Sequence, residues 1–295
     1  MRHANLADGP ELQRWSAHPL DPVIIIGAPR SGTNMLRDVL AAVPGLATWP
    51  CDEINYIWRH GNLRYPSDEF PRELARPEVR SFIRTRFHRL AMRAGASHVV
   101  EKTCANSLRI GFIEAIVPEA RYIHIRRNPI DAIASAFRRW RAPLSLSYVM
   151  RKARFVPPSD VAYYALRYGA NRLHKLASAE RHLATWGPRF NGMDAMLHRA
   201  TLLEVCTHQW QRCAQSAERA LRVLGAERSC EVDYEEFVSR PREELQRILG
   251  FLGVPADGIT MAAAVKNVAP TEVGKGQHEL TETELRVVRR VLSDH

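Results

Sequence analysis

The sequence predicts an α/β fold in which a parallel sheet is covered by helices. The first observation is the uninterrupted β-branched run at 23–26, which is typical of a strand buried on both faces. A glycine-containing turn at 27–32 follows it, and then apolar residues recur at helical spacing until Pro44 and Gly45. The second observation is that further short apolar runs alternate with amphipathic segments, as in successive βα units.

The remaining elements follow in chain order. Three more strands are predicted, at 98–100, 122–125 and 230–234. Asn128 is expected to cap a helix whose first residue is Pro129. A further helix is predicted after Pro241, and a last one opens at 281–284 with the Thr-x-x-Glu pattern of a capping box.

The 295 residues suit a single domain, 1–295, that carries one insertion. The insertion is placed at 141–203, where the sequence becomes basic and aromatic. We interpret it as helical. It either covers an acceptor site or presents a solvated helical face, and the sequence favours neither interpretation.

Composition narrows the classes of partner. Lysine and arginine exceed aspartate and glutamate by 42 to 32, a net charge of +10, which favours anionic partners such as nucleotides, acidic glycans or anionic membrane surfaces. No nucleic-acid-binding motif is present, so no nucleic-acid partner is expected. The five cysteines are scattered without a C-x-x-C pair, so neither a disulfide framework nor a metal site is predicted.

The expected location is cytoplasmic. The N-terminal stretch 1–15 has no apolar core of the kind that signal peptides carry, and the run at 23–26 is too short to span a bilayer. Peripheral membrane contact stays open.

The turn at 27–33 is a candidate phosphate loop. It joins a buried strand to a helix, where backbone amides and the helix N-terminus bind anions and the hydroxyls of Ser31 and Thr33 add donors. The spacing is similar to the start of a P-loop, but Gly32 is followed by Thr33 and Asn34, so the P-loop lysine is missing. A P-loop kinase is therefore an alternative that the sequence disfavours.

A second anion site is predicted at the end of the strand 122–125. Arg127 lies at the mouth of the sheet, and Ser135 lies two helical turns further along. An arginine fork and a hydroxyl together suit one phosphate group.

Together the two sites resemble the nucleotide-binding signatures of the sulfotransferase superfamily, whose donor is 3′-phosphoadenosine 5′-phosphosulfate (PAPS). The similarity continues through 101–103, 186–190, 233–237 and 273–276, and the motifs are nearer to the bacterial, glycan and tyrosylprotein branches than to the cytosolic one. The resemblance implies a P-loop-like, doubly wound parallel sheet with helices on both faces and a helical insertion. It also implies PAPS as sulfuryl donor, the bisphosphate PAP as product, and no required metal.

The resemblance assigns roles to individual residues. Arg30, Ser31, Gly32 and Thr33, with the adjoining Asn34, would bind the 5′-phosphosulfate, and Arg127 and Ser135 the 3′-phosphate. The segment Gly274, Lys275 and Gly276 resembles the loop that closes over the nucleotide. Tyr234 is a weaker candidate for the nucleotide pocket, with a core aromatic as the alternative.

The same resemblance implies an in-line displacement, with cations near the leaving phosphate and a base for the acceptor proton. Arg30 and Lys102 are the predicted cations, and Glu53 is the predicted base, with Asp52 as the fallback. His60 is either an acceptor contact or a structural histidine.

The acceptor is predicted to be a hydroxyl, with an amine as the less favoured option, on a small molecule, a glycan or a lipid-linked molecule. The alternative from another class is a basic binding or scaffolding protein with an inactive nucleotide pocket. The sequence predicts no oligomeric state.

Overall fold

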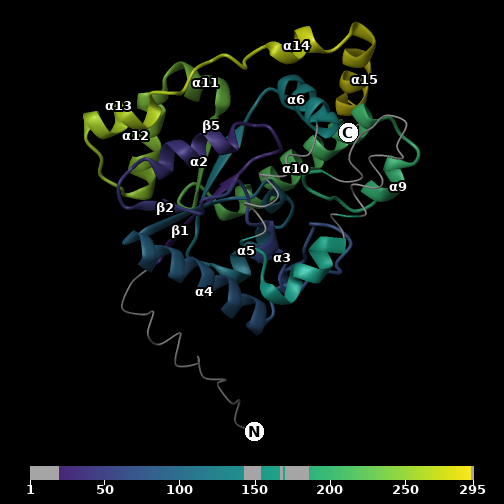
Figure 1. The fold of residues 1–295 in the computed structure, drawn as a ribbon. Helices are drawn as coiled ribbons and strands as arrows, with labels where there is room; N and C mark the ends of the chain where they lie inside the picture. The colour runs from purple at the N-terminus through teal and green to yellow at the C-terminus, as the bar shows by residue number, and fades with distance from the viewer. Residues whose placement is uncertain (1–19, 143–153, 167–168, 170–185, 294–295) are drawn as a thin grey trace.

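The computed structural model describes residues 20–142, 154–166, 169 and 186–293 (Figure 1). At its centre is a five-stranded sheet in the order β2-β3-β1-β4-β5, with every neighbouring pair parallel. The strands are β1 (Asp21–Ile26), β2 (Leu46–Thr48), β3 (His98–Lys102), β4 (Arg121–Arg126) and β5 (Ser229–Asp233). The predicted α/β class and its parallel sheet are confirmed.

Two details differ from the strands expected from sequence. The edge strand β2 was not predicted, because three residues are too few to show an alternation or an apolar run. Tyr234 was expected to end the fourth predicted strand, but it begins helix α11 (Tyr234–Ser239). The side chain of Asp233 accepts a hydrogen bond from the Glu236 amide and so caps that helix.

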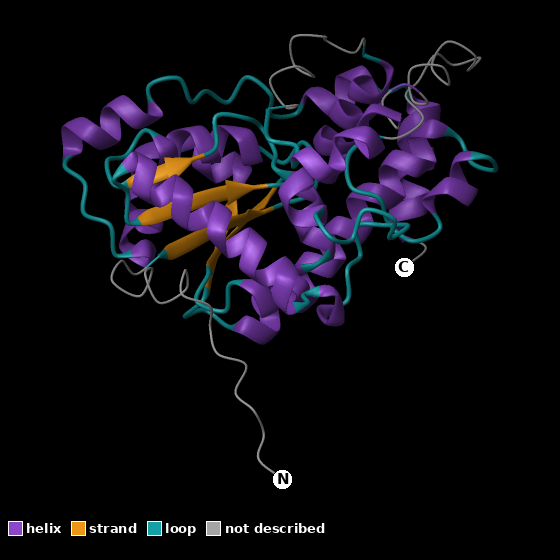
Figure 2. Ribbon diagram, turned by 60° about the horizontal axis from the view of Figure 1, so that its bottom comes forward, coloured by secondary structure: helices purple, strands orange, loops and turns teal. Residues whose placement is uncertain are grey.

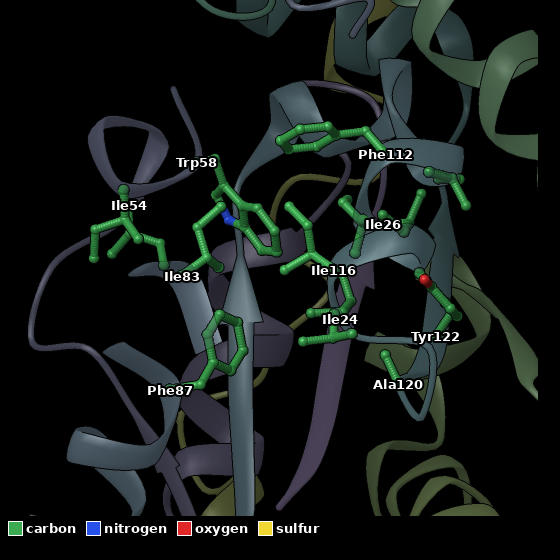
Figure 3. Packing of buried hydrophobic residues seen from close by; sticks show 14 of the residues in the cluster. Ile24, Ile26, Ile54, Trp58, Ile83, Phe87, Phe112, Ile116, Ala120 and Tyr122 are labelled. Carbon is green, nitrogen blue, oxygen red and sulfur yellow. The ribbon is translucent and has the colours of Figure 1, made fainter. Parts of the chain in front are cut away.

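Helices cover both faces of the sheet (Figure 2). In β1, Val23 and Ile25 pack toward α2 (Thr33–Ala41), α11, α12 (Pro241–Leu252) and α13 (Gly258–Val265). Ile24 and Ile26 pack on the opposite face, among α3 (Asn55–Arg59), α4 (Pro77–Ala94), α5 (Ile110–Ile116) and α10 (Leu202–Leu224). Figure 3 shows Trp58, Phe87 and Phe112 converging on this second face. The sheet is therefore doubly wound, and its strands are apolar on both sides for that reason.

A third cluster of buried side chains lies around Trp140, among α6 (Pro129–Arg141), α9 (Met193–Leu197), α10 and α15 (Glu282–Ser293). Figure 1 shows α14 (Lys275–Glu279) and α15 beside α6. The predicted caps are present: Asn128 accepts hydrogen bonds from the Ile130 and Asp131 amides, and Thr281 forms the reciprocal pair with Glu284.

The short helices complete the list: the 3-10 helices η1 (Arg72–Leu74), η2 (Cys104–Leu108) and η3 (Pro158–Asp160). Of the predicted insertion at 141–203, the described residues include η3, a helical stretch at 161–166, and α9. The rest of it lies outside the described residues, and the proposed division of the chain stays a prediction.

Candidate active site

The candidate phosphate loop follows β1 directly and leads into α2. Arg30 has φ 69° and Gly32 has φ 87°, both in the left-handed region. A Cβ placed on Gly32 would lie 2.4 Å from Cδ2 of Tyr234, so only glycine fits beneath that ring. The turn brings Ser31 and Thr33, both almost fully buried, to the N-terminus of α2. Amide and hydroxyl donors therefore gather at one helix end, as an anion site requires.

The two predicted anion sites meet through three side chains. Arg30 Nε donates to Ser135 Oγ at 3.0 Å, and Arg127 Nη1 donates to the Arg30 carbonyl at 2.9 Å. The Arg127 guanidinium lies 4.5 Å above the centre of the Tyr234 ring. Tyr234 is itself buried in the core cluster that includes α2, as the core-aromatic interpretation predicted, and its place in a nucleotide pocket stays a prediction.

Positive charge is concentrated around Arg30. Burial lowers the pKa of Arg30, and the charges of Arg139, Arg127 and Arg138 lower it further, against a raising effect of Cys104. Cations that repel one another in a desolvated place favour the binding of an anion between them.

The glycine segment 274–276 closes against the N-terminus of α6. The Asp131 carboxylate accepts hydrogen bonds from the amides of Gly274 (2.8 Å) and Gly276 (2.7 Å). A Cβ on Gly276 would meet the Ile130 carbonyl oxygen at 2.6 Å, so this contact also requires glycine. Sequence reasoning missed Asp131, because an acid in a first helical turn ordinarily only complements the helix dipole.

Arg127 ties the same segment to the loop. Its Nη2 donates to the Glu272 carbonyl at 2.5 Å, and Lys275 pairs with the Glu272 carboxylate at 2.5 Å. Arg127 Nε is buried and finds no hydrogen-bond partner among the described residues. One donor of this arginine is therefore left for a ligand.

A cleft of about 500 Å³ opens between these elements. Ser31, Arg127, Asp131 and Gly274 lie in its wall, together with Trp210 of α10. The cleft thus joins the loop, the strand end of β4 and the C-terminal segment. It lies at the carboxyl edge of the sheet, where open α/β sheets bind ligands.

Glu53 and Lys102 form the second half of the site, at the end of β3. Lys102 Nζ lies 3.2 Å from Glu53 Oε1, and the amide of Cys104 donates to the same oxygen at 3.3 Å. Burial acts to lower the pKa of Lys102, but the attraction of the Glu53 carboxylate acts to raise it and is the stronger effect. The pKa of Lys102 is therefore raised. Lys102 is therefore held as a cation although its side chain is 3% exposed.

This pair lies next to the phosphate loop. β3 neighbours β1 with Lys102 paired to Ile25, two residues before the loop begins. Cys104 contacts both neighbours: its Sγ lies 3.7 Å from Thr33 Oγ1, and its amide donates to Glu53. Cys104 therefore lies between the Glu53 carboxylate and the start of α2. The fold brings the predicted base and both predicted cations to the same edge of the sheet.

Asp52, the alternative base, lies elsewhere. Its side chain is 40% exposed and approaches Arg37 at 3.8 Å. Arg37 also binds the carbonyls of Cys51 and Asp52, which anchors the backbone before Glu53. Of the two acids, Glu53 is the one that contacts Lys102.

Two other sequence candidates have structural partners. His60 Nδ1 lies 2.9 Å from the buried Asp160, which joins α3 to the insertion. In the segment 186–190, the amide of Arg189 donates to Asp68 at 2.9 Å, and Gln209 donates to two of its carbonyls. Neither contact involves the phosphate loop.

The sequence model of the family described as "Sulfotransferase family" matches residues 22–184 and 171–258, which together make up most of the chain. The chain belongs to the sulfotransferase family. The predicted resemblance to that superfamily is therefore confirmed. Within the described residues, no cluster of three or more potential metal ligands occurs, and no helix is long and apolar enough to cross a membrane.

Individual relatives agree with this membership. The nodulation protein NoeE of Sinorhizobium fredii is 25% identical over 252 residues, which cover 81% of this chain and 51% of NoeE. The chain thus spans about half the length of this relative.

Solved sulfotransferase structures share the fold. The sulfotransferase domain of the Synechococcus PCC 7002 olefin synthase matches with a TM-score of 0.53 and 16% identity, over 94% of this chain and 97% of that domain. The sulfotransferase domain from the curacin biosynthetic pathway matches with a TM-score of 0.54 and 15% identity, over 93% of this chain and 98% of that domain. The parallel α/β architecture is the one predicted.

Proposed function

We propose that this sulfotransferase-family chain transfers the sulfuryl group of PAPS to an acceptor hydroxyl. The observation that carries the proposal is the Glu53–Lys102 pair at 3.2 Å, next to the phosphate loop at the carboxyl edge of the sheet. A base and a buried cation beside an anion site are the parts that sulfuryl transfer needs.

The donor would lie across the ends of β1 and β4. Arg30, Ser31, Gly32, Thr33 and Asn34 would bind the 5′-phosphosulfate through the loop and the start of α2. Arg127 and Ser135 would bind the 3′-phosphate, and the buried Nε of Arg127 supports this role because it lacks another partner in the described structure. Gly274, Lys275 and Gly276 would cover the nucleotide, with Tyr234 beneath it.

In the reaction, the oxygen of the acceptor hydroxyl bonds to sulfur, and Glu53 accepts the proton of that hydroxyl. The bond between sulfur and the bridging phosphate oxygen breaks, and its electron pair stays on the phosphate of PAP. Arg30 and Lys102 stabilise the negative charge that develops there. These two cations supply the charge that magnesium supplies in phosphoryl transfer.

The acceptor class follows from the basic surroundings. Arg138 and Arg139 lie on α6 beside the site, which favours a glycan, a lipid-linked molecule or another small acceptor with anionic groups. A hydroxyl is preferred to an amine.

The first test is thermal stabilisation by PAP, compared with ADP in the presence and absence of magnesium. A ligand that binds only the folded protein raises its melting temperature by mass action. We expect PAP alone to stabilise the protein, and Arg127→Ala to abolish the effect. Arg289→Ala, on the exposed face of α15, is the matched control. Preferential stabilisation by ADP with magnesium would favour a kinase, and no response to any nucleotide would refute the proposal.

A further inference from the structure

The buried carboxylate of Glu101 is not used in the transfer described above. It lies in β3, 1% exposed, paired in register with Ile24 in the middle of the sheet. Its two oxygens accept short hydrogen bonds, from Thr103 Oγ1 at 2.5 Å and from Asn106 Nδ2 at 2.7 Å. Burying a carboxylate in a sheet is costly, so a satisfied carboxylate at this place calls for an explanation.

The first hydrogen bond leads to the residue after the proposed base. A threonine hydroxyl has one proton, and Thr103 gives it to Glu101. A lone pair of Thr103 Oγ1 therefore faces the Ile54 amide, which donates to it at 3.2 Å. Glu101 thus fixes the direction of the hydroxyl that holds the backbone beside Glu53.

The second hydrogen bond of Glu101 leads, through Asn106 and Arg109, to Asn55, which follows Ile54 in the chain. Asn106 directs its amide nitrogen to Glu101, so its carbonyl oxygen accepts from Arg109 Nε at 2.9 Å. Arg109 Nη2 in turn donates to Asn55 Oδ1 at 2.6 Å. Both oxygens of Glu101 therefore act on the start of α3.

The residues 102–104, at the end of β3 and just after it, contact different parts of the segment 53–54. Lys102 and the Cys104 amide hold the Glu53 carboxylate, while Thr103 holds the Ile54 backbone. Residues at the end of β3 and just after it thus contact the Glu53 side chain and the Ile54 main chain.

We propose that Glu101 is a positioning residue, which sets the place of the general base Glu53 through Thr103 and through the Asn106–Arg109 pair. This inference rests on the proposed function of Glu53. Base catalysis depends on the distance between the base and the proton, and a displacement of about 1 Å can cost on the order of 100-fold in rate. Burial raises the pKa of Glu101 to about 7, against the lowering effect of Arg109 and Lys102, the charged groups that face it.

The sharpest test compares Thr103→Val, which keeps the shape and removes the hydroxyl, with Thr103→Ser, which keeps the hydroxyl. Thr207→Val is the matched control, because Thr207 is also fully buried and, within the described part of the chain, its hydroxyl donates to the Leu203 carbonyl of its own helix α10. Four quantities are measured in each variant: amide hydrogen exchange at Ile54, thermal stabilisation by PAP, kcat, and KM for PAPS. The probe acceptor is unsubstituted phenol, whose hydroxyl keeps its proton at neutral pH, and where the wild type does not use phenol the transfer to water is measured in all the proteins alike.

Thr103→Val is expected to raise exchange at Ile54 and to lower kcat by roughly tenfold or more, while stabilisation by PAP and KM for PAPS stay as in the wild type. Thr103→Ser is expected to restore kcat and exchange, and Thr207→Val to change neither. Glu101→Gln replaces one acceptor oxygen by an NH₂ group, so one of its two hydrogen bonds is lost, and kcat is expected to fall without loss of PAP stabilisation.

Unchanged kcat or unchanged Ile54 exchange in Thr103→Val would overturn the inference. Equal loss of kcat and of PAP stabilisation would also overturn it, because it would indicate a general structural role. Failure of the proposed function is a different result, in which the wild-type protein itself is not stabilised by PAP.

Discussion

Arg30 Nε and Ser135 Oγ are joined by a hydrogen bond of 3.0 Å, although 105 residues separate them in the chain. The residue from the phosphate loop and the residue from α6 therefore belong to one site. Arg127 completes the link by binding the Arg30 carbonyl.

Ser135→Ala is expected to weaken PAP binding by roughly 10- to 150-fold, since a hydrogen bond to a charged partner contributes about 1.5–3 kcal/mol. The substitution removes both the predicted phosphate contact and the hydroxyl that orients Arg30. Titration calorimetry with PAP measures the change. Ser239→Ala in α11 is the control, because among the described residues the Ser239 hydroxyl donates to the Glu236 carbonyl of the same helix. Equal affinities for the two variants would contradict the shared site.

Glu53→Gln is expected to bind PAP like the wild type and to lose turnover by roughly 100-fold or more, the range attributed to a general base. The amide keeps the shape of the side chain and cannot accept the proton. Transfer of labelled sulfate from PAPS to an acceptor panel measures the loss. Asp52→Asn, whose side chain is largely outside the site, should keep most of the activity. The opposite order of the two variants would assign the base to Asp52.

Burial raises the pKa of Glu101 to about 7, and this gives a stability prediction with a definite sign. The folded state holds the proton of Glu101 more tightly than the unfolded chain, so stability is lost as the pH rises from about 4.5 to about 7. Relative to wild type, Glu101→Gln should therefore gain about 3 kcal/mol in unfolding free energy between pH 4.5 and pH 8.

Urea unfolding at a series of pH values measures this difference. The pKa of His124 is lowered by burial to about 4, but His124 is present in both proteins and its contribution cancels. A difference that does not change with pH would show that Glu101 titrates alike in the folded and unfolded states.

Gly32→Ala is expected to destabilise the protein more than Gly192→Ala. The two glycines have nearly the same φ, 87° and 86°, so the cost of the left-handed backbone, about 1–2 kcal/mol, is common to both. A Cβ on Gly32 meets Tyr234, whereas one on Gly192 meets nothing within 4 Å. Gly32→Ala should therefore lower the free energy of unfolding by about 1–3 kcal/mol more than Gly192→Ala does, which is the usual cost of overpacking.

Thermal unfolding of the two variants measures the excess, and PAP titration should show a loss of binding in Gly32→Ala alone. Equal destabilisation would mean that the Tyr234 ring moves aside freely.

The sequence predicted four of the five strands, because buried parallel strands leave continuous apolar runs that need no knowledge of the tertiary fold. It missed β2, which is only three residues long. It also placed Arg30 and Lys102 at the ends of predicted strands, and the carboxyl ends of parallel strands share one edge, whereas Glu53 was located only as an acid that follows the first helix. Their roles in binding and catalysis stay predictions.

The contacts that support the site were beyond sequence reasoning. Asp131 and Glu101 are single acids within ordinary patterns, and their importance depends on partners far along the chain, at 274–276 for Asp131 and at Ile54 for the Glu101–Thr103 link. The Arg30–Ser135 hydrogen bond likewise depends on how α6 packs against the loop.

The strand order has a consequence for how such a protein changes over time. β1 lies between β3, which bears Lys102 and faces Glu53, and β4, which leads to Arg127. On the proposed function, the base Glu53 lies on the β3 side of β1, and the 3′-phosphate site at Arg127 lies on the β4 side. Substitutions on α3 that leave Glu53 and Lys102 in place would therefore change the surroundings of the acceptor without touching the residues proposed to hold the 3′-phosphate, so acceptor preference and nucleotide binding would be separable.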